Sequence, residues 1–225
     1  MRSVEEFPRY VAIEGPIGVG KSTLAELLAI RFRAQLLFEG FEENPFLQHF
    51  YDDPKRLAFQ TQIFFLLSRY RQQQDLIQTD LFYTSVVSDY MFEKDRIFAA
   101  LTLSEDELKL YDQIERALGK TVPTPDVVIY LQSGVGRLEE NIKQRGRKFE
   151  KNLSRSYLEE LVHRYNEYFF HYRETRLIVV NADSMDFQRN PEHLDLIARS
   201  ILRTPHPPVE YLALVDDGPF KLTPH

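Results

Sequence analysis

Residues 15–22, GPIGVGKS, decide the fold of this 225-residue chain. They match the pattern G-x-x-x-x-G-K-[ST] and follow directly on the apolar run YVAIE, residues 10–14. After them, the segment STLAELLAIRFR, residues 22–33, repeats apolar side chains at helical spacing. The order of strand, glycine-rich loop and helix is the context in which this pattern binds a nucleoside triphosphate.

The glycines of this loop let the backbone approach phosphate oxygens, and the helix that follows adds a favourable dipole. We expect Lys21 to reach the β and γ phosphates and the hydroxyl of Ser22 to bind Mg²⁺. The predicted phosphate site consists of Gly15, Gly18, Gly20, Lys21, Ser22 and Thr23.

The composition narrows the class of protein. With 43% hydrophobic and 28% charged residues, the chain can bury the core of one globular domain. It has no cysteine, which excludes disulfides and thiolate metal sites and fits a reducing cytoplasm. No apolar stretch approaches the roughly 18 residues that span a bilayer, and a net charge of −6 argues against a nucleic-acid-binding surface. We therefore expect a cytoplasmic protein with neither a membrane nor a nucleic-acid partner.

Apolar runs alternate with helical segments along the chain, which predicts an α/β domain with a five-stranded parallel sheet flanked by helices. The five predicted strands lie at residues 10–14, 35–38, 85–89, 125–132 and 176–182. After Leu202 the sequence is rich in proline and loses its periodicity. We expect one domain over residues 1–202 and a tail, residues 203–225, that is flexible or packs on a neighbour.

Two carboxylates follow predicted strands. Glu39 ends the second strand and Asp89 ends the third, so both are expected at the carboxyl edge of the sheet, beside the phosphate loop. One can deprotonate an attacking hydroxyl and the other can hold the metal. For Asp89, the alternative is a simple helix N-cap. A GTPase is disfavoured, because the guanine-reading motif N-K-x-D is absent from the sequence.

Arg145, Gly146 and Arg147 place two guanidinium groups around a predicted helix break. In a triphosphate-binding protein this pattern indicates a helical lid that closes over the transferred phosphate and supplies positive charge. The alternative is an exposed helix face.

Gln62 and Arg69 are seven residues apart on a predicted helix and therefore share one face. An amide and a guanidinium among aromatic side chains suit the edge of a nucleobase. A solvated polar stripe is the alternative, and periodicity alone does not decide between the two.

The chain resembles the bacterial deoxynucleoside kinases of the deoxyguanosine and deoxyadenosine kinase group, which have the thymidylate-kinase-like P-loop fold. The resemblance covers about residues 10–190 and rests on the segments GPIGVGKST, EGFEENPFLQHFYDDPKRLAFQTQIFFLLSRYRQ, RGRKFE and VVNADSMDF. It implies an ATP- and Mg²⁺-dependent kinase that phosphorylates the 5′-hydroxyl of a deoxynucleoside, of the purine type.

The resemblance also implies residue roles. Glu39 would be the base that activates the 5′-hydroxyl, and Tyr51 would contact the sugar 3′-hydroxyl. Gln62 and Arg69 would read the nucleobase, and Glu150 would reach the sugar.

On the donor side, the resemblance implies that Arg145 and Arg147 act from the lid. The loop of residues 181–187, with Asp186 and Phe187, would surround the adenine of ATP. Relatives of this kind are homodimers joined through helices, which implies the same for this chain.

Two positions depart from the family pattern. Glu39 is followed by Gly40-Phe41, where these kinases usually have Pro-Val. The third strand of these kinases usually ends in Asp-Arg or Glu-Arg, whereas this chain has Asp89-Tyr90-Met91. Either Arg96 or the lid arginines supply the missing charge, or phosphoryl transfer is weakened. Two alternatives therefore stay open: a nucleoside-monophosphate kinase that recruits Arg69 and Arg96, and a nucleotide-binding protein of low catalytic activity.

Overall fold

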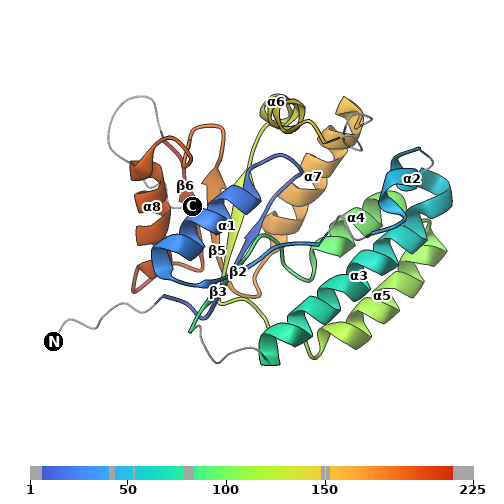
Figure 1. Ribbon diagram of the computed structural model, residues 1–225, viewed down its shortest axis with the longest axis horizontal. Helices are drawn as coiled ribbons and strands as arrows, with labels where there is room; N and C mark the ends of the chain where they lie inside the picture. The colour runs from blue at the N-terminus through green and yellow to red at the C-terminus, as the bar shows by residue number, and fades with distance from the viewer. Residues whose placement is uncertain are drawn as a thin grey trace.

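The structure is a computed structural model, and it describes residues 7–40, 44–52, 54–78, 84–147, 150 and 153–214. Its centre is one parallel sheet with the strand order β2-β3-β1-β4-β5-β6 (Figure 1). The strands are β1 (Tyr10–Glu14), β2 (Gln35–Leu37), β3 (Val86–Ser88), β4 (Val127–Gln132), β5 (Arg176–Asn181) and β6 (Val209–Leu212). The expected α/β class, with a parallel sheet flanked by helices, is confirmed.

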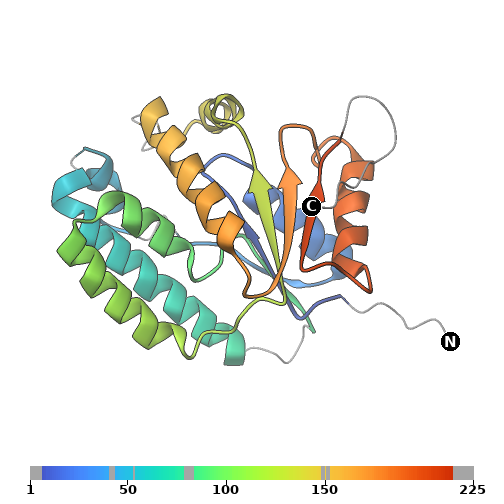
Figure 2. The same ribbon diagram turned by 180° about the vertical axis from the view of Figure 1, so that it is seen from behind.

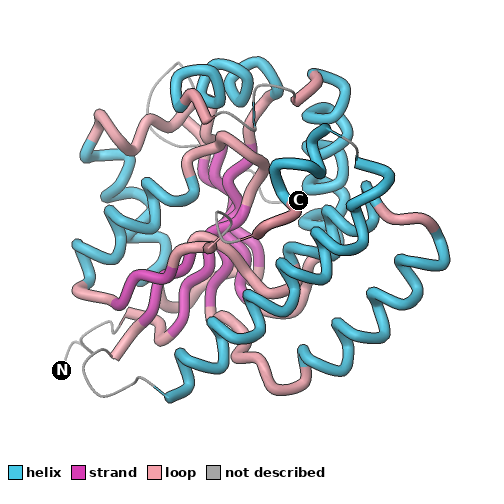
Figure 3. Tube along the Cα trace, turned by 45° about the vertical axis from the view of Figure 1, so that its right-hand side comes forward, coloured by secondary structure: helices cyan, strands magenta, loops and turns pink. Residues whose placement is uncertain are grey.

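Helices cover both faces of this sheet, so that the strands lie between two helical layers (Figures 2 and 3). The helices are α1 (Lys21–Phe32), α2 (Leu47–Asp52), α3 (Pro54–Gln78), α4 (Lys94–Thr102), α5 (Glu105–Gly119), α6 (Val135–Arg145), α7 (Arg155–His171) and α8 (Pro191–Leu202). Among the described residues, none of these helices is long and apolar enough to cross a membrane.

Alternate residues of the central strands face opposite layers. In β1, Val11 and Ile13 pack in the core under α1 and α8, whereas Tyr10 and Ala12 pack in the core under α4 and α7. Burial on both faces explains why these strands consist almost entirely of apolar residues. The polar residues that end the strands are therefore left at the carboxyl edge, next to the loop before α1.

The prediction of five strands is wrong by one, because the described residues contain a sixth. Strand β6 lies in the segment that we expected to be a tail, and it pairs with β5. Its Glu210 is buried and forms an ion pair of 3.3 Å with Arg176 of β5. The sequence did not predict this strand because it is short, follows two prolines and contains a glutamate, so it lacks a continuous apolar run. Residues 215–225, the rest of the predicted tail, lie outside the described part.

The connection into α4 contains a buried acid. Glu93 directly precedes this helix, and its Oε2 atom has no hydrogen-bond partner among the described residues. Burial, together with the nearby carboxylates Glu174, Glu115 and Glu14, raises the pKa of Glu93 from 4.5 to about 7. The folded protein thus keeps a proton that the unfolded chain releases, so its stability falls as the pH rises between these two values.

We expect Glu93→Gln to remove this decline and to increase the free energy of unfolding above pH 7 by about 1–3 kcal/mol. Urea unfolding at about pH 5 and about pH 8 measures the free energy of unfolding of both proteins. Glu26→Gln, at an exposed position of α1, is the control and should follow the unaltered protein. Equal pH dependence of the Glu93 variant and the unaltered protein would contradict the assignment.

Candidate functional site

The phosphate loop has the backbone that its glycines were expected to provide. Gly15 and Gly18 have positive φ values of 151° and 86°. A Cβ atom on Gly15 would lie 2.6 Å from the carbonyl oxygen of Leu131, and one on Gly18 would lie 2.8 Å from Cγ1 of Ile142. Glycine is therefore needed at both positions. The first turn of α1 carries no acidic side chain, which leaves its N–H groups suited to an anion.

Lys21 lies along this loop. Its Nζ donates hydrogen bonds to the carbonyl oxygens of Gly15 at 2.7 Å and Pro16 at 3.0 Å. Burial, together with the positive charge of Lys94, lowers the pKa of Lys21 to about 8. The lysine predicted to bind phosphate is thus placed at the mouth of the loop.

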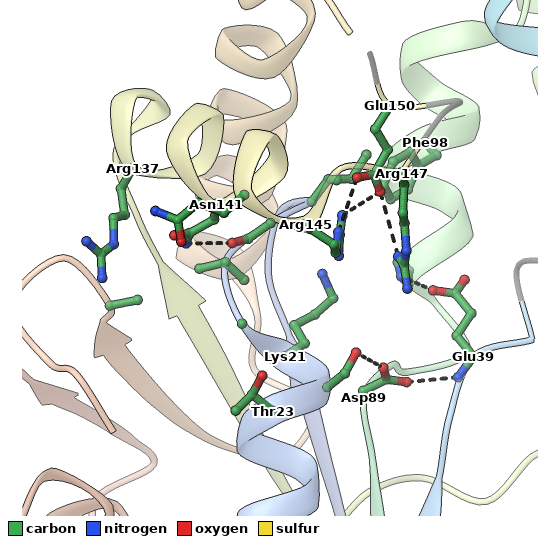
Figure 4. A pocket seen from close by; sticks show the side chains of 18 of the residues that line it. Lys21, Thr23, Glu39, Asp89, Phe98, Arg137, Asn141, Arg145, Arg147 and Glu150 are labelled. Carbon is green, nitrogen blue, oxygen red and sulfur yellow. Dashed lines mark hydrogen bonds and ion pairs between the residues drawn. The ribbon is translucent and has the colours of Figure 1, made fainter. Parts of the chain in front are cut away.

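Asp89 connects the phosphate loop to the end of β2. Its Oδ2 accepts a hydrogen bond of 2.5 Å from the Ser22 hydroxyl, and its Oδ1 accepts one of 2.9 Å from the backbone N–H of Glu39 (Figure 4). Asp89 does not cap α4, whose N-cap is Glu93, so the helix-cap alternative is wrong. A hydroxyl and a carboxylate side by side are the oxygen ligands that Mg²⁺ binds together with phosphate oxygens, so these residues fit the metal.

Glu39 is a largely buried carboxylate between two cations. Its Oε1 accepts a short hydrogen bond from the guanidinium of Arg69, and its Oε2 lies 2.5 Å from Nζ of Lys94. Burial alone would raise the pKa of Glu39, but Arg69 and Lys94 hold it well below its ordinary value. The side chain is therefore ionised.

The expected nucleobase-reading residues of α3 are buried and line a cavity, which contradicts the solvated-stripe alternative. Gln62 and Arg69 are each 3% exposed. Arg69 bridges Glu39 and Asp95. Within the described residues, Oε1 of Gln62, Nε of Arg69 and Oδ2 of Asp95 are buried without a hydrogen-bond partner. Buried polar atoms without partners are costly, so this set indicates a polar ligand.

The arginines at the end of α6 meet on one buried carboxylate. Arg145 Nε donates to Glu150 Oε2 at 3.1 Å, and Arg147 Nη1 lies 3.7 Å from Glu150 Oε1. Glu150 is 4% exposed. Figure 4 shows both guanidinium groups on the same side of the cavity, above Lys21. Both arginines line the cavity with partly exposed side chains, which favours the predicted lid over a helix face that contacts solvent alone.

One cavity of about 530 Å³ joins these groups. It extends from Phe50, Gln62 and Arg69 past Glu39 and Asp89 to the loop after β5. There, Asp186 and Phe187 line it, and the Phe187 ring closes against Gly20, where an added Cβ would lie 3.3 Å away. Thr23 accepts a hydrogen bond of 3.1 Å from Gln188 at this end. The predicted donor and acceptor residues thus share one space.

The structure contradicts the role considered for Arg96, whereas the prediction for Tyr51 falls on a side chain outside the described part. Arg96, proposed as a substitute for the missing arginine, is exposed and pairs with Asp112 at 3.2 Å, because it lies on the outer face of α4. The side chain of Tyr51 lies outside the described part, although its backbone belongs to α2.

The sequence analysis also missed Lys94 and Asp95, which are 6% and 1% exposed. Both lie in the charged run EKDR, residues 93–96, which reads as the solvated start of a helix. One available signal was the spacing of Lys94 and Phe98, which places an ammonium and an aromatic ring on one helix face.

The chain is similar to several known proteins. A sequence model of the deoxynucleoside kinase family matches residues 11–204. Deoxyguanosine kinase from Bacillus subtilis is 38% identical over 199 residues, which cover 85% of this chain and 95% of that protein. Deoxyadenosine/deoxycytidine kinase from the same organism is 31% identical, over 87% of this chain and 93% of the relative. Deoxyadenosine kinase from M. mycoides, solved with the products dCMP and a flexible dCDP bound, superposes with a TM-score of 0.74 at 26% identity, over 84% and 97% of the two chains.

Proposed function

The chain belongs to the deoxynucleoside kinase family, and we propose that it transfers the γ-phosphoryl group of ATP to the 5′-hydroxyl of a purine deoxynucleoside. One observation carries the proposal. A single cavity contains the phosphate loop, the buried ionised carboxylate of Glu39 and the unpartnered polar atoms of Gln62, Arg69 and Asp95. This cavity therefore has the groups needed to bind a triphosphate donor, the hydroxyl of an acceptor and the polar ring of a nucleobase.

The donor end binds phosphate through the backbone of the phosphate loop and through Lys21, which leaves the carbonyls of its own loop to reach the phosphates. Phe187 and Asp186 lie beside the nucleobase of ATP. Mg²⁺, held by Ser22 and Asp89, would add positive charge at the phosphate oxygens. Arg145 and Arg147 close over the transferred group from the lid.

The acceptor end suits an uncharged nucleoside. Arg69 is committed to Glu39 and Asp95, and Arg96 lies outside the cavity in a pair with Asp112. A nucleoside-monophosphate kinase was expected to recruit these two cations. Neither of them is available to hold an acceptor phosphate. The amide of Gln62 can accept and donate at the edge of a purine, and the Oδ2 atom of the Asp95 carboxylate can accept.

In the reaction, Glu39 accepts the proton of the 5′-hydroxyl while the 5′ oxygen forms a bond to the γ-phosphorus. The bond from this phosphorus to the bridging oxygen breaks, and ADP leaves with its electron pair. A carboxylate held between two cations is a weak base.

We also propose a cytoplasmic homodimer, as the family resemblance implies. In support, α3 and α5 carry exposed apolar side chains, with Leu67 38% and Leu110 47% exposed. Light scattering after size-exclusion chromatography measures the subunit number.

A coupled ADP-release assay over the four deoxynucleosides and their four 5′-monophosphates tests the function. We expect turnover with deoxyguanosine and deoxyadenosine, and none above the ATPase background with the monophosphates. Turnover with the monophosphates would support a monophosphate kinase instead. ATP binding without turnover on any acceptor would support the nucleotide-binding protein.

A further inference from the structure

We propose that Lys94 is a catalytic residue of the phosphoryl transfer described above, and that it supplies the cation that Tyr90 does not. The inference rests on the proposed function and identifies which residue of this chain provides the charge. The sequence offered Arg96 and the lid arginines for this role, and Lys94 was not among the candidates.

Lys94 is placed where the charge is needed. It is the first residue of α4 and is 6% exposed, yet it lines the same cavity as Lys21 and Arg145. Its Nζ lies 2.5 Å from Oε2 of Glu39 and 5.8 Å from the centre of the Phe98 ring. Within the described residues this nitrogen donates one hydrogen bond, to Glu39, so two of its three N–H groups remain for a ligand.

Four buried charges form an alternating row, Lys94 to Glu39 to Arg69 to Asp95. Each carboxylate or guanidinium inside the row has a partner on both sides. Lys94 is the cationic end, and it lines the same cavity as Lys21 of the phosphate loop. The ammonium of Lys94 therefore lies at the end of the row that is nearer to the phosphate loop, and it has a carboxylate partner on one side only.

The connection that carries Lys94 is held to the phosphate loop by one buried carboxylate. Glu14, at the end of β1, accepts a hydrogen bond of 2.9 Å from the backbone N–H of Met91. It also accepts bonds from the N–H of Gly15 at 3.1 Å and the hydroxyl of Tyr165 at 3.2 Å. The backbone N–H of Lys94 in turn bonds to the carbonyl of Met91. This fixes the position of the ammonium relative to the phosphates.

The other residues near this point are engaged elsewhere. Tyr90 is fully buried and its hydroxyl donates to Gln72 at 2.8 Å, while the Arg69 guanidinium lies 5.7 Å from its ring centre. Arg96 is exposed and paired with Asp112. The cationic function has thus moved from the strand end to the first residue of α4.

Charge movement in the reaction explains how Lys94 acts. When Glu39 accepts the proton of the 5′-hydroxyl, its negative charge disappears and the ammonium loses its partner. At the same time, the negative charge appears on the transferred phosphoryl group and on the departing ADP. Lys94, within reach of Glu39, can stabilise that charge in the transition state more than in the ground state.

Lys94→Met is the primary test. We expect kcat to fall about 100- to 1,000-fold, whereas KM for both substrates and the affinity for an ATP analogue change by less than about threefold. Arg96→Met is the matched control, a cation two positions away on the exposed face, and should stay within about twofold.

Two further variants separate charge from structure. Lys94→Gln keeps a hydrogen-bond donor to Glu39 without the charge, and Lys94→Arg keeps both. A catalytic cation predicts that Arg retains activity within about tenfold while Gln is as poor as Met. Equal activity of Gln and Arg, or a kcat of the Met variant close to normal, would overturn the proposal. The Gln and Arg pair decides the matter if the Met variant does not fold. If the unaltered protein shows no turnover, the proposed function fails, and not this inference.

Discussion

Glu39→Gln is expected to lower kcat about 100- to 10,000-fold and to leave the affinity for ATP nearly unchanged. Glutamine has the size of glutamate but cannot accept the proton of a 5′-hydroxyl. ATP affinity depends on the phosphate loop and on Lys21, which interact with Glu39 only through charge. Single-turnover kinetics with deoxyguanosine, together with titration of a fluorescent ATP analogue, measure the two effects separately.

Stability has to be measured alongside, because the substitution also breaks two buried ion pairs. Arg69 keeps Asp95 as an anionic partner, whereas Lys94 loses the negative charge that neutralises it. We expect the free energy of unfolding to fall by a few kcal/mol, about 3–5 at most. Assays therefore belong well below the unfolding temperature of the variant. Glu26→Gln, exposed on α1, controls for the loss of a charge. Preserved turnover in a folded Glu39 variant would remove Glu39 from its assigned role.

The phosphate loop and the strand-end acids were predictable because their positions follow from local rules. Gly15 to Ser22 form a contiguous pattern, and the parallel sheet brings Glu39 and Asp89 to one edge regardless of how the helices pack. The hydrogen bonds of Asp89 to Ser22 and to the backbone of Glu39 agree with that expectation. The arrangement of the strands alone was therefore enough to predict that these side chains lie near one another.

Lys94 and Asp95 could not be found in this way, because their burial is a tertiary effect. They are covered by α3 and by the segment after β2, and the partners that neutralise them are 55 and 26 positions away, at Glu39 and Arg69. A charged run at a helix start is exposed to solvent in most proteins. The local sequence therefore predicts exposed side chains where the structure has buried ones. The same holds for β6, whose buried Glu210 is neutralised by Arg176 and Arg203.

The second large effect is expected for Arg69→Met, which should reduce both stability and activity. Arg69 is the one guanidinium between two buried carboxylates, Glu39 and Asp95, among the described residues. Removing it leaves both charges close together, so we expect the free energy of unfolding to fall by about 3–5 kcal/mol at neutral pH. We also expect kcat/KM for deoxynucleosides to fall at least about 100-fold, because the nucleobase loses a paired hydrogen-bond partner.

The pH dependence of this loss follows from the carboxylates. Burial raises the pKa of Asp95 and Arg69 counteracts that rise, which leaves the pKa at about 6. Without Arg69 the folded protein holds protons on its acids to a higher pH than the unfolded chain does. The variant is therefore relatively more stable in acid, and its deficit should shrink as the pH falls from about 8 to about 5. Urea unfolding across this range measures the deficit. The control variant Arg164→Met breaks an exposed ion pair on α7 and should show no such pH-dependent loss of stability.

The double variant Arg69→Met/Asp95→Asn separates the structural role of Arg69 from its role in substrate binding. Removing the Asp95 charge takes away the repulsion with Glu39, so about 1–3 kcal/mol of the lost stability should return as a coupling energy. Activity should not return, because neither the guanidinium nor the carboxyl that reads the nucleobase is restored. Recovery of kcat/KM together with stability would show that Arg69 only compensates buried charge. In that case the nucleobase would have to be read without Arg69, and Gln62 is the remaining predicted residue whose buried Oε1 lacks a partner among the described atoms.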